Sequence, residues 1–202
     1  MACQAALTKQ GVAVLIVPVD ISHAEVHEDF PYRVHHSKPM VIPNDDELAE
    51  IAKILNAGKK ITLYAGAGCE DALDEIKAVA EILKAPVAHT SRAKSYLEHD
   101  NPFNVGMTGI LGSEAGYKAI LDCDTLLLLG ADFAWRQFYP DKAKIVQIDI
   151  NSTHLGRRHH ITFGAVGDIK PSLRALMPRL EQHGDASFQQ EYVERFAKAM
   201  AA

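Results

Sequence analysis

Short apolar runs alternate with longer amphipathic segments along most of this sequence of 202 residues. Runs without polar residues at alternate positions are typical of strands buried on both faces, while apolar residues spaced three or four apart indicate helices. The runs predict strands at 12–18, 61–65, 86–90, 125–131, 144–150 and 161–168. The amphipathic segments predict helices within 43–60, 66–85, 117–123, 169–182 and 188–200. This alternation predicts an α/β fold, a Rossmann-like parallel sheet of about six strands with helices on both faces.

The first helix of this regular part has clear boundary signals. Asn44 is its predicted N-cap, Asp and Glu occupy its first turn, and Gly58 is the predicted stop. By contrast, residues 91–116 show no steady period and are expected to be mostly loop. Residues 183–187 are expected to form a joint before the last helix.

The N-terminal residues do not have the pattern of a domain start. What looks like the end of a helix precedes Gly11 and leads into the predicted strand at 12–18, with no features of a secretory signal. Residues 22–43 carry prolines and mix histidines with acidic residues, which predicts a linker that runs across a surface. We therefore expect a fragment of a longer chain.

Composition and charge exclude several classes of function. The net charge of -5 and the absence of a Lys/Arg run argue against nucleic acid as the main partner. The apolar runs are far shorter than the roughly 20 residues of a membrane-spanning helix, so no membrane contact is expected. Cys3, Cys69 and Cys123 form no CxxC motif, which favours a reducing compartment, with the cytoplasm as the default.

The predicted strands end on small or acidic residues. In parallel α/β sheets, ligands lie at the carboxyl ends of the strands, where small residues let backbone N–H groups approach phosphates. The strand ends are Gly66-Ala67-Gly68, Thr90-Ser91, Gly130-Ala131-Asp132, Asp149-Ile150-Asn151 and Gly167-Asp168. So many ends of this type favour a long ligand along the sheet edge over a single small metabolite.

Several of these residues also have purely structural explanations. Residues 66–71 lack the third glycine of GxGxxG, so a tight strand-to-helix turn is favoured there. Asp149 could accept a ribose hydroxyl or cap the segment after it. Cys69 has no His or Lys fixed beside it, which favours a packed structural thiol. The aromatic residues within 133–139 could stack on a flat cofactor or close the core.

Catalytic motifs are absent from the sequence. It contains no GxSxG, Walker loop or HExxH, and no Asp or Glu pair whose setting marks it as acid and base. Histidines such as His23 and His27, or His159 and His160, lack a Cys or Asp that would complete a metal site, so scattered surface histidines are favoured. The sequence thus predicts a ligand-binding domain with neither catalytic nor metal-binding residues.

Four segments carry a resemblance to a known family. They are SRAKSYLEHDNPFNVGMTGILG at 91–112, DTLLLLGADFAWRQFYP at 124–140, KIVQIDIN at 144–151 and AVGDIK at 165–170. In order and spacing they resemble the central domain of pyruvate oxidase and quinone-dependent pyruvate dehydrogenase, in the thiamine-diphosphate-dependent family that includes acetolactate synthase. The resemblance covers nearly the whole chain. It implies the end of a pyrimidine-binding domain at 1–21, a linker at 22–43, the central dinucleotide-binding domain at 44–183, and at 184–202 the start of a linker to a pyrophosphate-binding domain.

The resemblance implies an extended FAD in this domain. The turn Gly66-Ala67-Gly68 would approach the dinucleotide, and Arg92 and Lys94 could offer cations to phosphate. The main flavin-nucleotide contacts would come from Met107, Thr108, Gly109, Ile110, Gly130, Ala131, Asp132, Phe133 and Ala134. The adenosine end would be lined by Asp149, Ile150, Asn151, Gly167 and Asp168.

For the whole enzyme, the resemblance implies oxidative decarboxylation of pyruvate, with electrons passed to FAD and then to a quinone or oxygen. Thiamine diphosphate and Mg²⁺ would be held by the missing pyrimidine- and pyrophosphate-binding domains, so the fragment alone would be inactive. A homotetramer is expected at full length. Two alternatives stay open. One is the central domain of an acetolactate synthase or non-oxidative 2-oxoacid decarboxylase. In such relatives the same fold binds ADP, binds FAD without redox use, or binds nothing. The other alternative is a structural spacer or oligomerisation module.

Overall fold

The computed structural model describes residues 1–9, 11–25, 33–35, 39–133 and 135–201. The chain forms two compact units, Met1–Pro39 and Met40–Ala202. Across the described ranges, no helix has both the length and the apolar character needed to cross a membrane.

The first unit contains two short helices, α1 (Ala2–Lys9) and α2 (Val19–Ser22). The predicted strand at 12–18 is wrong, because these residues form no strand and are exposed. An extended segment becomes a strand only when a neighbouring strand bonds its backbone N–H and C=O groups. The described part of this unit contains no strand that could do so.

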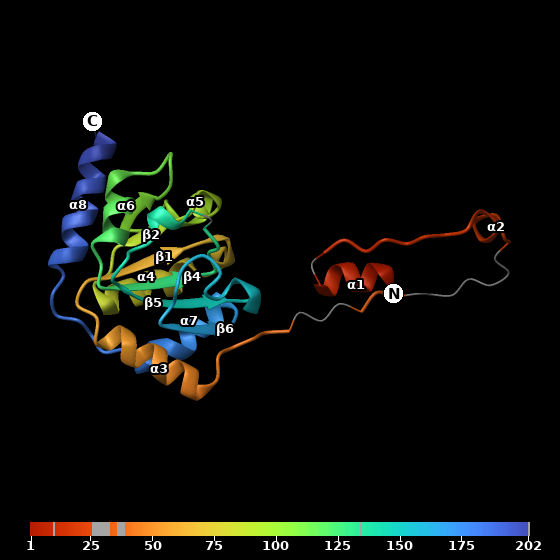
Figure 1. Ribbon diagram of the computed structural model, residues 1–202, viewed down its shortest axis with the longest axis horizontal. Helices are drawn as coiled ribbons and strands as arrows, with labels where there is room; N and C mark the ends of the chain where they lie inside the picture. Colours follow the sequence, from red (N-terminus) through yellow and green to blue (C-terminus); the bar gives the residue numbers. More distant parts are fainter. Residues whose placement is uncertain (10, 26–32, 36–38, 134, 202) are drawn as a thin grey trace. The chain divides into compact units, whose positions relative to one another are not determined.

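The second unit is built around one sheet of six parallel strands in the order β3-β2-β1-β4-β5-β6 (Figure 1). The strands are β1 (Ile61–Ala65), β2 (Val87–His89), β3 (Asn104–Met107), β4 (Thr125–Leu129), β5 (Lys144–Asp149) and β6 (Phe163–Val166). At the centre, β1 pairs with β4 and Leu63 lies opposite Leu127. Both central strands are buried throughout, as their unbroken apolar runs predict. The predicted α/β, Rossmann-like fold is confirmed.

Three helices cover one face of the sheet. Their inward residues, such as Ile51, Val79 and Leu173, are fully buried in one cluster with Leu63 and Val146 of the strands. The helices are α3 (Asp45–Asn56), α4 (Leu73–Leu83) and α7 (Ile169–Leu176), the last followed by the 3-10 helix η5 (Met177–Arg179).

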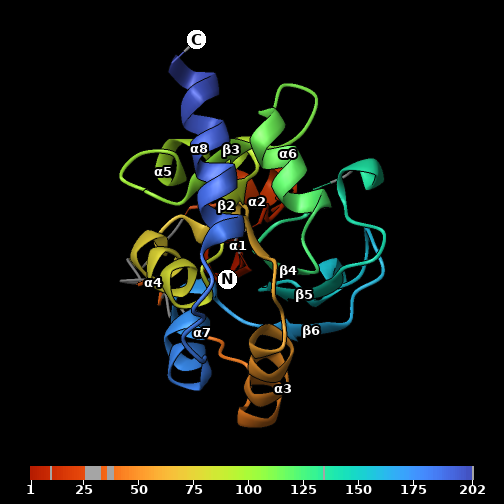
Figure 2. The same cartoon turned by 90° about the vertical axis from the view of Figure 1, so that its left-hand side faces the viewer.

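Two helices cover part of the other face. These are α6 (Glu114–Leu121) and α8 (Ser187–Ala201), which lie side by side (Figure 2). Ile120 of α6 and Tyr192 of α8 are buried in a second cluster with Tyr64 and Val105 of the strands. Helices on both faces are therefore confirmed, and the last helix packs on this unit through its buried side.

The predicted cap of α3 is confirmed. The side chain of Asn44 accepts a hydrogen bond from the N–H of Glu47 at 2.9 Å, and the Glu47 carboxylate accepts one from the N–H of Asn44 at 2.8 Å. This capping box satisfies two N–H groups that would otherwise lack partners at the helix start. The helix ends at Asn56, two residues before Gly58.

The second face is only partly covered by α-helices. In the described residues between β4 and β5, and between β5 and β6, the regular structure consists of 3-10 helices alone. These are η3 (Arg136–Phe138) and η4 (Ser152–His154). Over β4, β5 and β6, this face is therefore covered by loops.

The prediction that residues 91–116 are mostly loop needs a correction. This stretch contains β3, along with the short helices η2 (Ser91–Ala93) and α5 (Lys94–Leu97). β3 is an edge strand of four residues, and Gly106 adopts a φ of +88° within it. A strand this short with a glycine in it has no recognisable period. A Cβ on Gly106 would lie 2.6 Å from the ring of Phe196, because α8 packs directly on this edge.

Candidate functional site

The carboxyl ends of all six strands meet at one edge of the sheet, because the strands are parallel. From β1 the chain moves outward to β2 and β3, and from β4 it moves outward on the other side to β5 and β6. The direction of the strand order thus reverses between β1 and β4. In open α/β sheets, ligands bind beyond the carboxyl ends at this point. The loops at this edge form the candidate site.

The glycines that follow β1 and β4 pack against each other. The N–H of Gly66 donates to the carbonyl of Leu129 at 2.8 Å, and that of Gly68 to the carbonyl of Gly130 at 3.0 Å. The N–H of Gly130 donates to Ile148 at 2.9 Å. Gly130 has a φ of +52°, and a Cβ added there would lie 2.7 Å from the Cα of Gly68. Close backbone packing explains these glycines, and these N–H groups are used within the chain.

One alanine follows a glycine in each of these two turns. Ala67 is half-buried in η1 (Ala67–Cys69), and Ala131 is buried. Cys69 is fully buried, and its thiol donates to the carbonyl of Leu129 at 3.3 Å. Burial raises the pKa of Cys69 to about 12, so the predicted structural thiol is confirmed.

Arg92 and Lys94 lie after β2, and both are exposed. The ammonium of Lys94 is 2.8 Å from the carboxylate of Glu98, one helical turn away. The hydroxyl of Tyr96 donates to the carbonyl of Gly66 at 3.1 Å and so ties this segment to the turn after β1. Both cations are therefore on solvent-facing positions near the candidate edge.

The loop after β3 brings a buried hydroxyl to this edge. The N–H of Thr108 donates to the carbonyl of His89 at 3.1 Å, while its Oγ1 is buried without a hydrogen-bond partner in the described structure. Gly109 has a φ of +115°, and a Cβ there would lie 3.2 Å from the ring of Phe133. Met107 is half-buried, and Ile110 is 72% exposed. This loop therefore meets the loop that follows β4.

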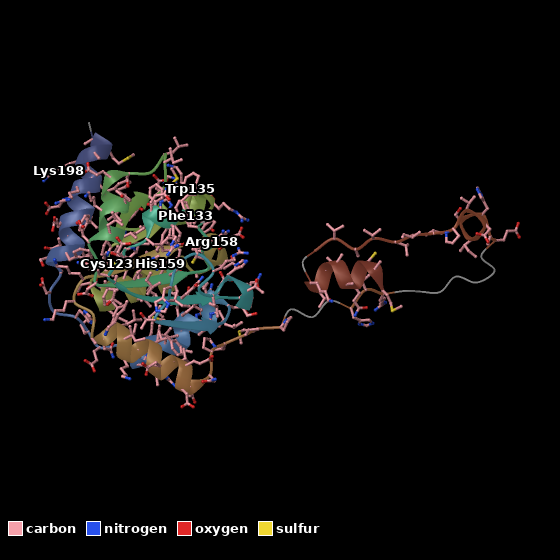
Figure 3. All side chains as sticks on the ribbon, viewed as in Figure 1. Cys123, Phe133, Trp135, Arg158, His159 and Lys198 are labelled. Carbon is pink, nitrogen blue, oxygen red and sulfur yellow. The ribbon has the colours of Figure 1, made fainter. Side chains whose placement is uncertain are left out.

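An aromatic cluster lies at the same place (Figure 3). The ring of Phe133 packs edge-to-face on Tyr64 at 6.0 Å, on Trp135 at 5.7 Å and on Phe138 at 5.6 Å between ring centroids. Trp135 is 42% exposed, whereas Tyr64 is buried. The cluster closes the core and also leaves an aromatic side chain at the surface, so both interpretations of residues 133–139 remain open. Ala134 lies outside the described residues.

Asp132 is engaged by two arginines that the sequence interpretation did not include. Its carboxylate accepts from Nε and Nη2 of Arg158 at 2.7 and 3.1 Å. It also accepts from Nε of Arg157 at 3.2 Å and from the Nη2 of the same residue. Two adjacent arginines between predicted strands were the signal available in the sequence. Their meeting with the end of β4 depends on tertiary structure.

The end of β5 is shaped by its own side chains. Asp149 is buried, and its Oδ1 accepts from the N–H of Asn151 at 2.8 Å and lies 3.3 Å from Nδ1 of His154. Asn151 accepts from the N–H of Thr153 at 3.0 Å. Asn151, and not Asp149, is therefore the N-cap of η4, while Asp149 bonds the backbone of the turn before this helix. Ile150 is 52% exposed between them.

Gly167 and Asp168 lie at the edge strand β6. The carboxylate of Asp168 accepts from the N–H of Val41 at 2.8 Å, and the N–H of Asp168 donates to the carbonyl of Val41 at 2.9 Å. The N–H of Gly167 donates to the carbonyl of Asp149 at 3.1 Å. The pair thus fastens residue 41 to the sheet. β6 is two strands from β4, a separation of about 10 Å.

The structure brings the predicted residues into two groups. The turn after β1 and the loops after β3 and β4 meet around Phe133 and Gly130, with Arg92 and Lys94 nearby. The residues after β5 and β6 form a second group, joined by the bond from Gly167 to Asp149. No set of three or more His, Cys, Asp or Glu side chains suited to a metal ion occurs in the described ranges.

Comparison with known proteins identifies the family. A family model described as "Thiamine pyrophosphate enzyme, central domain" matches residues 48–176. The chain belongs to this family. An uncharacterised 42.6 kDa protein of Pseudomonas amyloderamosa is 41% identical over 200 residues, which cover 98% of this chain and 50% of that protein. Acetolactate synthase of Mycobacterium bovis is 29% identical over 189 residues, which cover 89% of this chain and 30% of the synthase.

Two further comparisons agree with this family assignment. A Bacillus subtilis protein, YdaP, to which thiamine pyrophosphate is ascribed, is 31% identical over 192 residues and is covered to 33%. A solved structure of a Mycobacterium smegmatis protein ascribed to the thiamin diphosphate-dependent enzymes has a TM-score of 0.63 and 24% identity, covering 77% of this chain and 32% of that one. This likeness supports the fold alone. The chain spans half or less of the length of the curated relatives named here.

Proposed function

We propose that this chain is the FAD-binding central domain of a thiamine diphosphate-dependent enzyme, and that the whole enzyme decarboxylates pyruvate oxidatively. Electrons would pass through FAD to a quinone or oxygen. The proposal rests on one observation about this central domain. Its strands end at an edge where the strand order reverses, and small, aromatic and cationic residues line that edge. Pyrimidine- and pyrophosphate-binding domains would hold the thiamine diphosphate and Mg²⁺, and four such chains would assemble.

The residues at this edge fit an aromatic dinucleotide in part. The buried Thr108 hydroxyl lacks a partner among the described residues, and a ligand oxygen or nitrogen could provide one. Trp135 offers a partly exposed ring for a flat group, and Arg92 and Lys94 offer positive charge. The turn after β1 fits less well, because Gly66 and Gly68 already donate to the chain's own carbonyls. Bound FAD would supply the two-electron acceptance that the oxidation needs.

In this proposal the chain positions its cofactor and excludes water from it. The rings around Phe133 would hold the flat part of the ligand against the loop after β3, and Thr108 would fix its register. No side chain of this domain is assigned a proton-transfer step. Tyr64 is buried in the cluster and burial raises its pKa, so it stays protonated there.

A second candidate is the central domain of an acetolactate synthase. It is favoured by relatives that carry this name, among them the Mycobacterium bovis protein and a Methanocaldococcus jannaschii large subunit, 28% identical over 184 residues. FAD would then be bound without accepting electrons. Assay of the full-length protein with pyruvate separates the two candidates, because one predicts reduction of an added electron acceptor and the other predicts acetolactate.

The binding proposal is tested by titrating the chain with FAD, with ADP and NAD in parallel, and following flavin fluorescence. Saturable FAD binding is expected, and Thr108→Val should weaken it. Removal of a buried hydroxyl without a partner should not lower the stability of the fold, so urea unfolding of this variant serves as the control. Failure of both this chain and the full-length protein to bind FAD would overturn the proposal.

A further inference from the structure

The loops that cover β4 to β6 hold a concentrated group of cations. Arg157 and Arg158 both pair with Asp132, and the three side chains are 41%, 35% and 19% exposed. Two guanidinium groups on one carboxylate leave one uncompensated positive charge. Arg158 and His159 also line a small cavity together with Tyr139.

The backbone beside these arginines is hydrogen-bonded to a buried side chain of the sheet. Gln147 of β5 is buried, and its amide bonds the loop twice: Nε2 donates to the carbonyl of His154 at 3.2 Å, and Oε1 accepts from the N–H of Gly156 at 3.0 Å. The ring of His159 stacks on Tyr139 at 5.7 Å. Arg157 and Arg158 therefore lie between two fixed points, which reduces the entropy lost when they bind an anion.

The arginine group adjoins the candidate edge. The hydroxyl of Tyr139 donates to the carbonyl of Phe133 at 3.0 Å and so holds the loop between β4 and β5 together. This loop carries both the aromatic cluster and Asp132, the partner of the two arginines. Asp132 itself follows β4 after Gly130 and Ala131, next to the point where the strand order reverses. A ligand whose flat ring lies on Phe133 or Trp135 would have its charged part within reach of this group.

We propose that Arg157 and Arg158 form a binding site for a phosphate or diphosphate group, and that Asp132 is their internal counter-ion. Guanidinium groups bind phosphate oxygens through paired N–H donors, which suits this role. Asp132 is then a positioning residue and does not contact the ligand. The inference rests on the proposed function, since the diphosphate of a nucleotide is the ligand expected at this edge.

Arg157 and Arg158 are better prepared for this role than Arg92 and Lys94. Lys94 is paired with Glu98 and its side chain is 58% exposed. Arg92 is exposed in a 3-10 helix of three residues. Arg92 forms no ion pair in the described structure, and Lys94 is more exposed than either Arg157 or Arg158, so both would lose more conformational freedom on binding a phosphate.

Nucleotide titrations of the chain test the proposal. Arg158→Gln is expected to weaken ADP binding about tenfold and to leave adenosine binding unchanged, because adenosine has no phosphate. Arg136→Gln is the control, since it removes one positive charge at an exposed position of the neighbouring loop between β4 and β5. Equal loss of ADP affinity in the two variants would overturn the proposal.

Asp132→Asn distinguishes a counter-ion from a residue that contacts the ligand. If Asp132 is a counter-ion, its neutralisation strengthens ADP binding several-fold and leaves adenosine binding unchanged. If Asp132 instead accepts a ribose hydroxyl, both ligands bind more weakly, and that outcome also overturns the proposal.

Inorganic pyrophosphate separates this inference from the proposed function. NMR resonances of the arginine Nε–H groups are followed as pyrophosphate is added, with sulfate at equal ionic strength as the control. Selective shifts of Arg157 and Arg158 support the site even if FAD and ADP fail to bind, which would count against the proposed function alone. No shift of these two residues, or equal shifts with sulfate, would overturn the site.

Discussion

The second face of the sheet has two halves that are covered in different ways. Over β1 to β3, α6 and α8 bury apolar residues such as Ile120, which is 0% exposed. Over β4 to β6, loops present Trp135, which is 42% exposed, together with charged and aromatic neighbours. The half without α-helices carries the aromatic cluster around Phe133 and the two arginines that pair with Asp132, as is usual for loops on a rigid scaffold.

The two halves also satisfy their backbone polar groups differently. A helix bonds its own N–H and C=O groups, so its buried side chains can all be apolar. A loop cannot, and Gln147 is buried under the second half to bond the backbone at His154 and Gly156. We expect the helical half to contribute more stability and the loop half to contribute more specificity.

The largest effect is expected from the helical core. Ile120→Ala should lower the free energy of unfolding by about 2–5 kcal/mol, because a fully buried side chain is replaced by a cavity. Ile161→Ala, at a half-buried position of the loop half, should cost roughly 1 kcal/mol. Urea unfolding of both variants measures the difference, and equal losses would contradict the distinction between the halves.

The next effect concerns the backbone contact at the strand ends. Gly130→Ala should cost about 2–3 kcal/mol, because a Cβ on a residue with φ +52° would meet the backbone of Gly68. Gly184→Ala is the matched control, since a Cβ there meets nothing within 4 Å. The same urea series checks both, and a tolerated alanine at 130 would show that this turn can relax.

A smaller effect is expected at the attachment of α8. The hydroxyl of Tyr192 donates to the carboxylate of Asp122 at 2.6 Å, so Tyr192→Phe should cost about 1 kcal/mol. Tyr117→Phe is the control on α6, because the Tyr117 hydroxyl makes no hydrogen bond within the described structure. Thermal unfolding compares the two, and the expectation fails if both phenylalanine variants behave alike.

The last effect is a dependence on pH. Burial lowers the pKa of His89, so the folded chain holds this ring neutral while the unfolded chain binds a proton near pH 6.5. Stability should therefore fall as the pH drops below this value, by at most about 1.4 kcal/mol per pH unit from this residue. His89→Gln should flatten the pH profile of the urea midpoint, whereas substitution of the exposed His99 should not.

The sequence predicted the central strands well because their apolar runs are buried on both faces, as at 61–65 and 125–129. It failed where burial depends on distant partners. β3 is held by its pairing with β2 and by α8, whereas residues 12–18 have the composition of a strand but find no partner strand among the described residues of their unit. Composition alone cannot separate these two cases.

The same distinction between local patterns and distant contacts applies to the candidate site. The glycines after β1 and β4 and the aromatic residues near 133 could be found because small and aromatic residues at strand ends form a local pattern. The role of Asp132 could not be predicted, because Arg157 and Arg158 are separated from it by 25 and 26 residues. The partner of a charged side chain is decided by which loops meet in space.

The sequence by itself determined the α/β class, the central strands and the cap of α3, because these depend on residues that are near one another in the chain. Only the tertiary structure decided that the glycine turns pack on each other, that Thr108 has a buried hydroxyl without a partner, and that two arginines share one carboxylate. The physical reason is that periodicity and capping are local, whereas backbone contacts, burial and charge pairing depend on which loops the sheet brings together at its carboxyl edge.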